Sequence, residues 1–558
     1  MSYLPFTAAT GPEADLKHYR YDLGVLLSLA VLLFGLSVGT VRFVRDDIAN
    51  IYNFWDMIHS ETVAKSLSSI ASNAWLGLRR SFFFTWWIQY GLLRLSNLSD
   101  PLQSATTFYC FIFAVHFANS ALIYWLARRA LVDRMSALAM AAIYLSLPHA
   151  VETYFVANNW FFILPLFFYL LFWWLWMILQ PLTVSSVILQ SGALLLSMFS
   201  GEQLLALPFA VGLVQAVQLL AEKKTGWKTS LIHAVTVYGL TGFAYIIYLT
   251  VVSISPPNDP LSQPLSHYLS SNTVAIIGRY NDQLYYQIKS IFDPASWVYG
   301  EGSIGASPLA TVLGIASGVM FFVYLQAISV TRTGPRILWA VTYWIAAVLA
   351  VLMPMYTAAI LGVRPGPDTR YLLSPTLLIV ALLILMLLPL GRLIRSIAYS
   401  TLLSSCIFLT SLLLLDVWPT QAAIDRRLWQ ALEASIGPET DYVLTLNNSP
   451  EANYLMPPWQ SIAWSDFQAD WAIQSRFRHI FGRSIEMIRR ADLTGENSVL
   501  VEGYYGSKHT SVIDRISVIY FDSGRTLGQT LNGKIEIMTY RNYLAHREQL
   551  QIPEKRPN

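Results

Sequence analysis

Long runs of apolar residues, separated by short polar segments, dominate the chain up to residue 415. A membrane-spanning helix needs about 20 predominantly apolar residues. Eleven runs are near that length, and the third, fifth and sixth are the shortest. They cover residues 22–40, 104–126, 135–148, 156–179, 184–199, 204–220, 230–252, 306–330, 337–360, 372–390 and 397–415. The pattern predicts a polytopic α-helical membrane protein with about 11 transmembrane helices.

The pattern changes after residue 415, where charged and apolar positions mix. The segments "DYVLTL", "NSVLVEGYY", "RISVIYF" and "KIEIMTY" have the composition of strands, whereas "DRRLWQALEASIG" and the stretch near 471–490 are typical of helices. We therefore predict a transmembrane domain over residues 1–416 and a small α/β domain over residues 417–558.

The lysines and arginines of the short loops predict an orientation, because such loops are basic on the cytoplasmic side. With the N-terminus inside, the inner loops contain Arg128, Arg129, Arg134, Lys223, Lys224, Lys228, Arg332, Arg336, Arg392 and Arg395. Two large loops, 41–103 and 253–305, and the C-terminal domain then lie outside. Apolar residues at helical spacing in both loops, from Val63 to Leu78 and from Val274 to Ile291, predict helices in the membrane interface.

Composition supports this class of protein. Hydrophobic residues make up 54% of the 558 residues and charged residues only 13%, about half the charged share of soluble domains. The net charge of +3 is too small to indicate nucleic-acid binding. Both cysteines, Cys110 and Cys406, lie in apolar runs, so no disulfide framework is expected.

The unusual polar groups all fall on the predicted outer side. Carboxylates are costly near hydrocarbon, yet Asp46 and Asp47 directly follow the first span. The others are Arg79 and Arg80 in the first outer loop, His149 and Glu152 after the third span, Glu202 between the fifth and sixth, and Arg364, Asp368 and Arg370 after the ninth. A carboxylate can act as general base and an arginine can bind phosphate. Together they suit displacement of a lipid phosphate by a hydroxyl group.

Six short motifs follow in order along residues 22–390: "RDD", "RRSFFF", "VHFANS", "LPHAVET", "SGEQ" and "TRYLLSP". In this order the chain resembles the GT-C glycosyltransferases that use polyprenyl-phosphate sugars. It is most similar to the protein O-mannosyltransferase and tetratricopeptide-linked transmembrane O-mannosyltransferase branch. Gly201 stands where that family's turn has a lysine, and no tetratricopeptide pattern follows the last span.

The resemblance implies a GT-C-like fold and an inverting glycosyltransferase. Asp46 or Asp47 is then the catalytic base. In an extended segment neighbouring side chains point to opposite faces, so only one of the two can face the acceptor. The resembled family favours the first of such a pair, so we favour Asp46. Arg370, with Tyr371, would bind the donor phosphate. The expected substrate-binding residues are His149, Glu152, Arg79, Arg80 and Glu202. An acidic pair serves with or without a divalent cation, so the sequence leaves metal dependence open.

Other interpretations compete with this one. The acid pair could be a solvated helix end, Arg370 a surface anchor, and His116 a hydrogen-bond partner between helices. An O-antigen ligase or polymerase would also use an undecaprenyl carrier, and a transporter or flippase of lipid-linked sugars would use the same membrane. For the glycosyltransferase we expect a glycan, lipid or protein acceptor. We expect the bacterial inner membrane as its location, with the N-terminus in the cytoplasm and the C-terminal domain in the periplasm.

Overall fold

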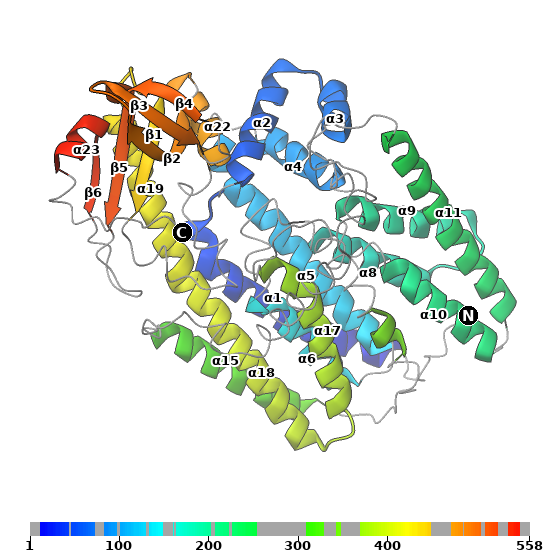
Figure 1. Ribbon diagram of the computed structural model, residues 1–558. Helices are drawn as coiled ribbons and strands as arrows, with labels where there is room; N and C mark the ends of the chain where they lie inside the picture. The colour runs from blue at the N-terminus through cyan, green and yellow to red at the C-terminus, as the bar shows by residue number, and fades with distance from the viewer. Residues whose placement is uncertain are drawn as a thin grey trace, which may run out of the picture.

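The computed structural model is mostly helical, with one sheet near the C-terminus (Figure 1). It describes residues 12–43, 46–72, 83–96, 101–129, 133–148, 160, 163–201, 207–222, 226–253, 308–328, 342–347, 369–447, 470–483, 485–503, 508–522 and 534–546. The helices up to residue 412 are α1 (Pro12–Ser37), α2 (Asp46–Ser60), α3 (Val63–Ser72), α4 (Phe83–Ser96), α5 (Ala105–Arg129), α6 (Arg134–Leu145), α8 (Ile163–Ile178), α9 (Val184–Ser200), α10 (Leu207–Glu222), α11 (Trp227–Ser253), α15 (Pro308–Ala327), α17 (Thr369–Leu387) and α18 (Arg392–Leu412).

Helices occupy ten of the eleven predicted spans. Within the described residues, five helices are long and apolar enough to cross a membrane, and they include α1, α5, α11, α15 and α18. Five more are apolar but shorter: Arg134–Leu145, Ile163–Ile178, Val184–Ser200, Leu207–Ala221 and Leu377–Leu387. Most of the predicted ninth span lies outside the described residues. The helical part is therefore that of a polytopic membrane protein.

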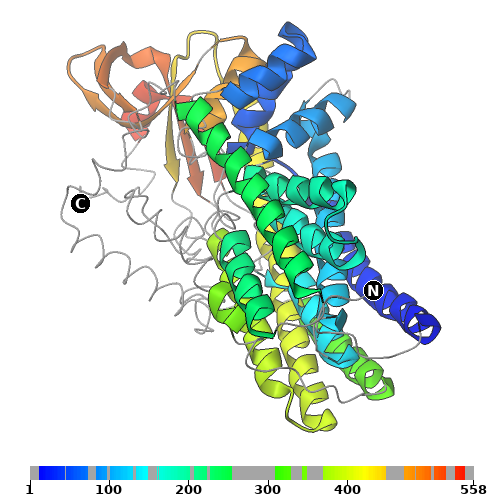
Figure 2. The same ribbon diagram turned by 90° about the vertical axis from the view of Figure 1, so that its right-hand side faces the viewer.

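Successive long helices run back and forth between two ends of a bundle, and the C-terminal sheet lies at one of them (Figure 2). We call this the domain end and the opposite one the far end. At the far end, Arg134 at the start of α6 binds Asp22, ten residues into α1. At the domain end, Thr410 near the end of α18 donates a hydrogen bond of 2.8 Å to the Ser146 carbonyl just after α6.

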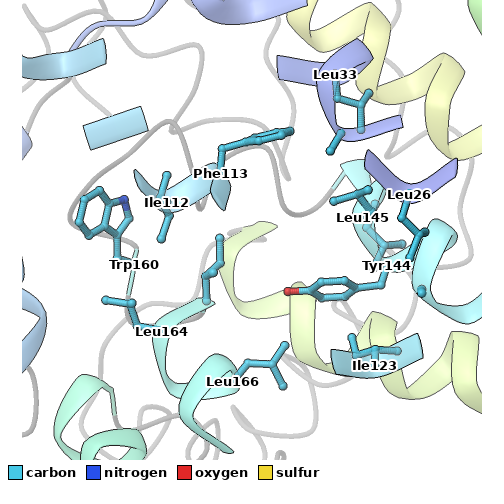
Figure 3. Packing of buried hydrophobic residues seen from close by; sticks show 14 of the residues in the cluster. Leu26, Leu33, Ile112, Phe113, Ile123, Tyr144, Leu145, Trp160, Leu164 and Leu166 are labelled. Atoms are coloured by element: carbon cyan, nitrogen blue, oxygen red, sulfur yellow. The ribbon is translucent and has the colours of Figure 1, made fainter. Parts of the chain in front are cut away.

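The bundle core surrounds α6, which is buried on every side except at Met140. A helix that is apolar all round is typical of a protein interior. Asp133 caps this helix by accepting a hydrogen bond of 3.0 Å from the Ser136 amide. Figure 3 shows Tyr144 and Leu145 of α6 among side chains of α1, α5 and α8.

Small residues join α15 to α18. A Cβ atom built on Gly314 would lie 2.8 Å from Phe408 Cβ, and one on Gly318 would lie 2.7 Å from Ser404 Cβ. The Ser404 hydroxyl donates a hydrogen bond of 2.8 Å to the Gly314 carbonyl. Close backbone approach at a small-xxx-small pattern is typical of helix pairs in membranes.

The C-terminal sheet has six strands in the order β4-β3-β2-β1-β5-β6. The strands are β1 (Tyr442–Asn447), β2 (Glu486–Leu493), β3 (Ser498–Gly503), β4 (Lys508–Val512), β5 (Ile516–Asp522) and β6 (Lys534–Thr539). β1 is parallel to β2 and β5, and the other pairs are antiparallel. Val443 of β1 packs with α19 (Trp418–Ser435) and α22 (Asp470–Phe481), and Leu444 packs on the other face with α23 (Tyr540–His546).

This domain confirms four predicted strands and both predicted helices, with one correction. The stretch near 471–490 is helical only as far as Phe481, and Glu486 already begins β2. The helix-favouring residues of "EMIRRADL" form a strand because β1 and β3 flank it on both sides. The edge strand β4 was not predicted.

The predicted domain boundary at residues 416/417 falls inside a continuous helical rod. α18 passes into a π-helical turn, Leu413–Val417, and then directly into α19. Leu414 and Trp418 belong to the bundle core, whereas Leu432 belongs to the core of the sheet domain. The two parts are therefore connected by a helix and not by an extended linker.

Candidate functional site

The acid pair begins a helix. α2 starts at Asp46 and continues through Asp47 to Ser60, so the expectation of an extended segment at this pair is wrong. Consecutive residues of a helix differ by about 100° in direction, and they do not point to opposite faces. Carboxylates in a first helical turn also interact favourably with the helix dipole. The side chains of both aspartates lie outside what the structure describes.

α2 packs onto the domain end of the bundle. Ile48, Ile51 and Phe54 are buried along one side of the helix. The Phe54 ring lies 6.4 Å from the Tyr90 ring of α4 and meets it edge to face. This face holds α2 against α4, the helix that follows Arg79 and Arg80 in the chain.

The start of α4 meets the end of α9. The Thr85 hydroxyl donates a hydrogen bond of 2.8 Å to the Ser200 carbonyl, and the rings of Phe83 and Phe199 are 5.0 Å apart. Arg79, Arg80 and Glu202 lie outside the described residues. Arg80 precedes Phe83 by three residues, and Glu202 follows Phe199 by three residues. Three residues of chain span at most about 10 Å, so both residues are close to this contact along the chain.

A series of aromatic ring contacts connects the residue three before Asp46 to Trp160. Phe43, three residues before Asp46, lies 5.0 Å from the Phe108 ring at the start of α5. Phe108 in turn lies 5.4 Å from the buried Trp160. Trp160 ends the segment that carries His149 and Glu152, both outside the described residues. Phe43 and Trp160 are therefore held against the same helix, α5.

Arg370 and Tyr371 lie in the first turn of α17, and their side chains are not among those described. α17 and α18 are joined by residues 388–391 and run antiparallel (Figure 1). Because α18 runs toward the domain end, α17 begins on the side nearer that end. Arg364 and Asp368 lie outside the described residues, as does the interfacial helix expected within 253–305.

The far end contains two buried ion pairs that sequence analysis did not identify. Arg134 donates to Asp22 through Nε at 2.7 Å and Nη2 at 2.8 Å. Arg395 donates to Asp133 at 2.5 Å. The tyrosines Tyr124 and Tyr324 donate to the two oxygens of Asp22. Arg134 and Arg395, which the sequence analysis assigned to inner loops, are thus neutralised inside the bundle. The adjacent charges Asp133 and Arg134 at the start of an apolar run could have indicated these buried pairs.

His116 takes the structural role considered for it. Its ring nitrogens lie 3.1 Å from the Tyr144 hydroxyl and 3.2 Å from the Leu145 carbonyl. The neighbouring Asn119 donates to the Ile163 carbonyl at 3.1 Å. These bonds connect α5 to α6 and α8 inside the bundle, so they stabilise packing between helices.

Within the described part of the chain, no three His, Cys, Asp or Glu side chains form a group that could hold a metal ion. The side chains of Asp46 and Asp47 are not among these described residues.

Comparison of the chain with protein-family models, with curated proteins and with solved structures found no match. At the domain end, described residues near Asp46, Arg80 and Glu202 in the chain pack on the bundle. At the far end, Asp22 binds Arg134 and Asp133 binds Arg395.

Proposed function

We propose that this protein is an integral-membrane glycosyltransferase with eleven spans and a GT-C-like fold. It transfers a sugar from a polyprenyl-phosphate donor to a hydroxyl group of a glycan, lipid or protein. The N-terminus lies in the cytoplasm, and transfer takes place on the extracytoplasmic face, where the C-terminal domain lies. The donor's tail lies among the apolar helices.

One observation carries this proposal: the segments that flank the predicted site residues contact one another at the domain end. The ring contacts hold Phe43 and Trp160 against Phe108, and the bond from Thr85 to Ser200 joins a second pair of stretches that are distant in sequence. A reaction between a lipid-borne phosphate sugar and a hydroxyl group needs acidic and basic groups close together, and these contacts support that arrangement.

The chemistry follows from the residue types. The acceptor hydroxyl gives its proton to Asp46 or Asp47, and its oxygen forms a bond to the anomeric carbon. The bond from that carbon to the phosphate oxygen breaks, and Arg370 stabilises the released phosphate. One displacement inverts the anomeric centre. His149, Glu152, Arg79, Arg80 and Glu202 line the pocket for sugar and acceptor.

A transporter is less well supported. Transport pathways place ionisable groups near the middle of the membrane. The buried charges Asp22, Asp133, Arg134 and Arg395 bind one another at the far end, which is the arrangement of a structural junction.

Asp46→Asn and Asp47→Asn test the proposed base. Loss of a general base lowers turnover by about 10²–10⁴-fold, so we expect one of the two variants to lose this much transfer to a radiolabelled acceptor in proteoliposomes. The matched control is Asp492→Asn in β2, whose side chain is half exposed. Full activity in both variants at normal expression would rule out the acid pair.

The donor separates this enzyme from a ligase or polymerase. We expect activity with a polyprenyl monophosphate sugar and none with the corresponding diphosphate. The opposite preference would favour the ligase or polymerase. Flux of the lipid-linked sugar without transfer would favour a flippase.

A further inference from the structure

The helix that carries the acid pair is held from two sides. One side of α2 packs on α4 and the bundle through Phe54. α2 also packs on α22, a helix of the C-terminal domain (Figure 1). A soluble domain therefore touches the very element that begins with Asp46.

The contact between α2 and α22 includes two aromatic rings. The Tyr52 and His479 ring centroids are 4.6 Å apart, with the ring planes tilted by 34°. Tyr52 is only 5% exposed. We call these two residues the ring joint. Tyr52 follows Asp47 by five residues, roughly 8 Å along a helix, so a change of direction at the ring joint moves the acid pair.

α22 is fixed to the core of its own domain. Phe477, two residues before His479, is fully buried and meets the Trp429 ring of α19 edge to face at 5.5 Å. The Arg476 guanidinium lies 3.8 Å from the centroid of the same indole. α22 therefore moves only together with α19.

α19 is in turn fixed to the bundle. It continues α18 through the π-helical turn, and Trp418 in its first turn is fully buried in the bundle core. The Arg42 guanidinium, four residues before Asp46, lies 5.2 Å from the centroid of the Trp418 ring. These contacts therefore connect α2 to α22, α22 to α19, and α19 to the residues just before α2.

We propose that the C-terminal domain sets the direction of α2, and through it the position of the acid pair, and that Tyr52 and His479 are positioning residues for sugar transfer. This inference rests on the proposed function. The physical reason is that α2 is short and the bundle holds only one of its sides. The ring joint supplies the second support, and a displacement of about 1 Å at a reacting group can cost up to 10²-fold in rate.

His479→Ala and Tyr52→Ala test the ring joint by kinetics. We expect each variant to lower kcat by about 10- to 100-fold while the KM for the donor stays unchanged, because neither residue touches the donor. The double variant should be no slower than the slower single variant, since the two rings act as one contact. His479→Phe keeps an aromatic ring and should retain most of kcat. The matched control is His509→Ala on the edge strand β4, an exposed histidine of the same domain.

A distance measurement makes the test independent of activity. Spin labels at Asn53→Cys on α2 and Ile394→Cys on α18 report the direction of α2 in a background where Cys110 and Cys406 are replaced by alanine. Both labelled positions are exposed. We expect His479→Ala to broaden this distance distribution and His509→Ala to leave it unchanged.

The two readouts separate the two proposals. An unchanged distribution in His479→Ala would overturn the ring joint, as would a broadened distribution with an undiminished kcat in an active enzyme. If the wild-type protein is inactive but His479→Ala still broadens the distance distribution, the proposed glycosyltransferase function is overturned. The ring joint would then still be the support of α2.

Discussion

The charged residues at the two ends of this molecule have different surroundings. Asp22 at the far end is fully buried and accepts hydrogen bonds from an arginine and two tyrosines. At the domain end, the acid pair begins a helix that a second domain supports. The buried charges at the far end hold helices together, whereas the acid pair at the start of α2 is the proposed catalytic base.

Asp22→Asn should destabilise the bundle strongly. Removing one partner of a buried ion pair leaves an uncompensated charge, which costs about 3–5 kcal/mol. We expect a clearly lower thermal unfolding midpoint in detergent, and a smaller loss in the double variant Asp22→Leu/Arg134→Met, which removes both charges. The control is Asp514→Asn, because the Asp514–Arg541 pair is more than half exposed on both sides. Equal midpoints for Asp22→Asn and Asp514→Asn would contradict the structural role.

Individual helices depend on close contacts that only small residues permit. Gly314 and Gly318 allow α15 to approach α18, and Ser404 bonds across the gap. Exposed apolar residues such as Val312, Ile315 and Val319 lie on other sides of α15. This division is the one expected for a helix with one protein-facing and one lipid-facing side.

Gly318→Ala should weaken this helix pair. The added Cβ would lie 2.7 Å from Ser404 Cβ and 3.2 Å from the Ser400 carbonyl oxygen, which is backbone and cannot easily move. Overpacking of this kind costs about 1–3 kcal/mol, so we expect a lower unfolding midpoint. Gly239→Ala in α11 is the control, because a Cβ there meets nothing within 4 Å. A similar midpoint for both variants would show that α15 and α18 do not pack this closely.

Elements with a strong local pattern could be predicted, and those that depend on distant partners could not. Ten apolar runs form helices because their length and composition suffice. β2 was mistaken for helix, because its strand conformation comes from pairing with β1 and β3. The helix at Asp46 was missed for a similar reason: its support comes from α4 and α22, distant in sequence. The same holds for Asp133 and Arg134, whose partners Arg395 and Asp22 lie on other helices.

At the scale of the whole molecule, two connections link the membrane bundle to the sheet domain. One is the continuous helix of α18 and α19, and the other is the contact between α2 and α22. The rod of α18 and α19 places the sheet at the domain end, and α22 then reaches α2 (Figure 2). The C-terminal domain therefore contacts the helix that begins with the acid pair, and we expect its removal to lower the rate of sugar transfer.

We propose that distant acidic and basic groups share one cavity at the domain end. An experimental structure of the protein in nanodiscs with a bound polyprenyl-phosphate sugar would show whether they do. We expect the phosphate within hydrogen-bond distance of Arg370 and the anomeric carbon within one sugar's width of Asp46. A structure in which the acid pair and Arg370 open onto separate surfaces, with no cavity between them, would rule out the proposed transfer.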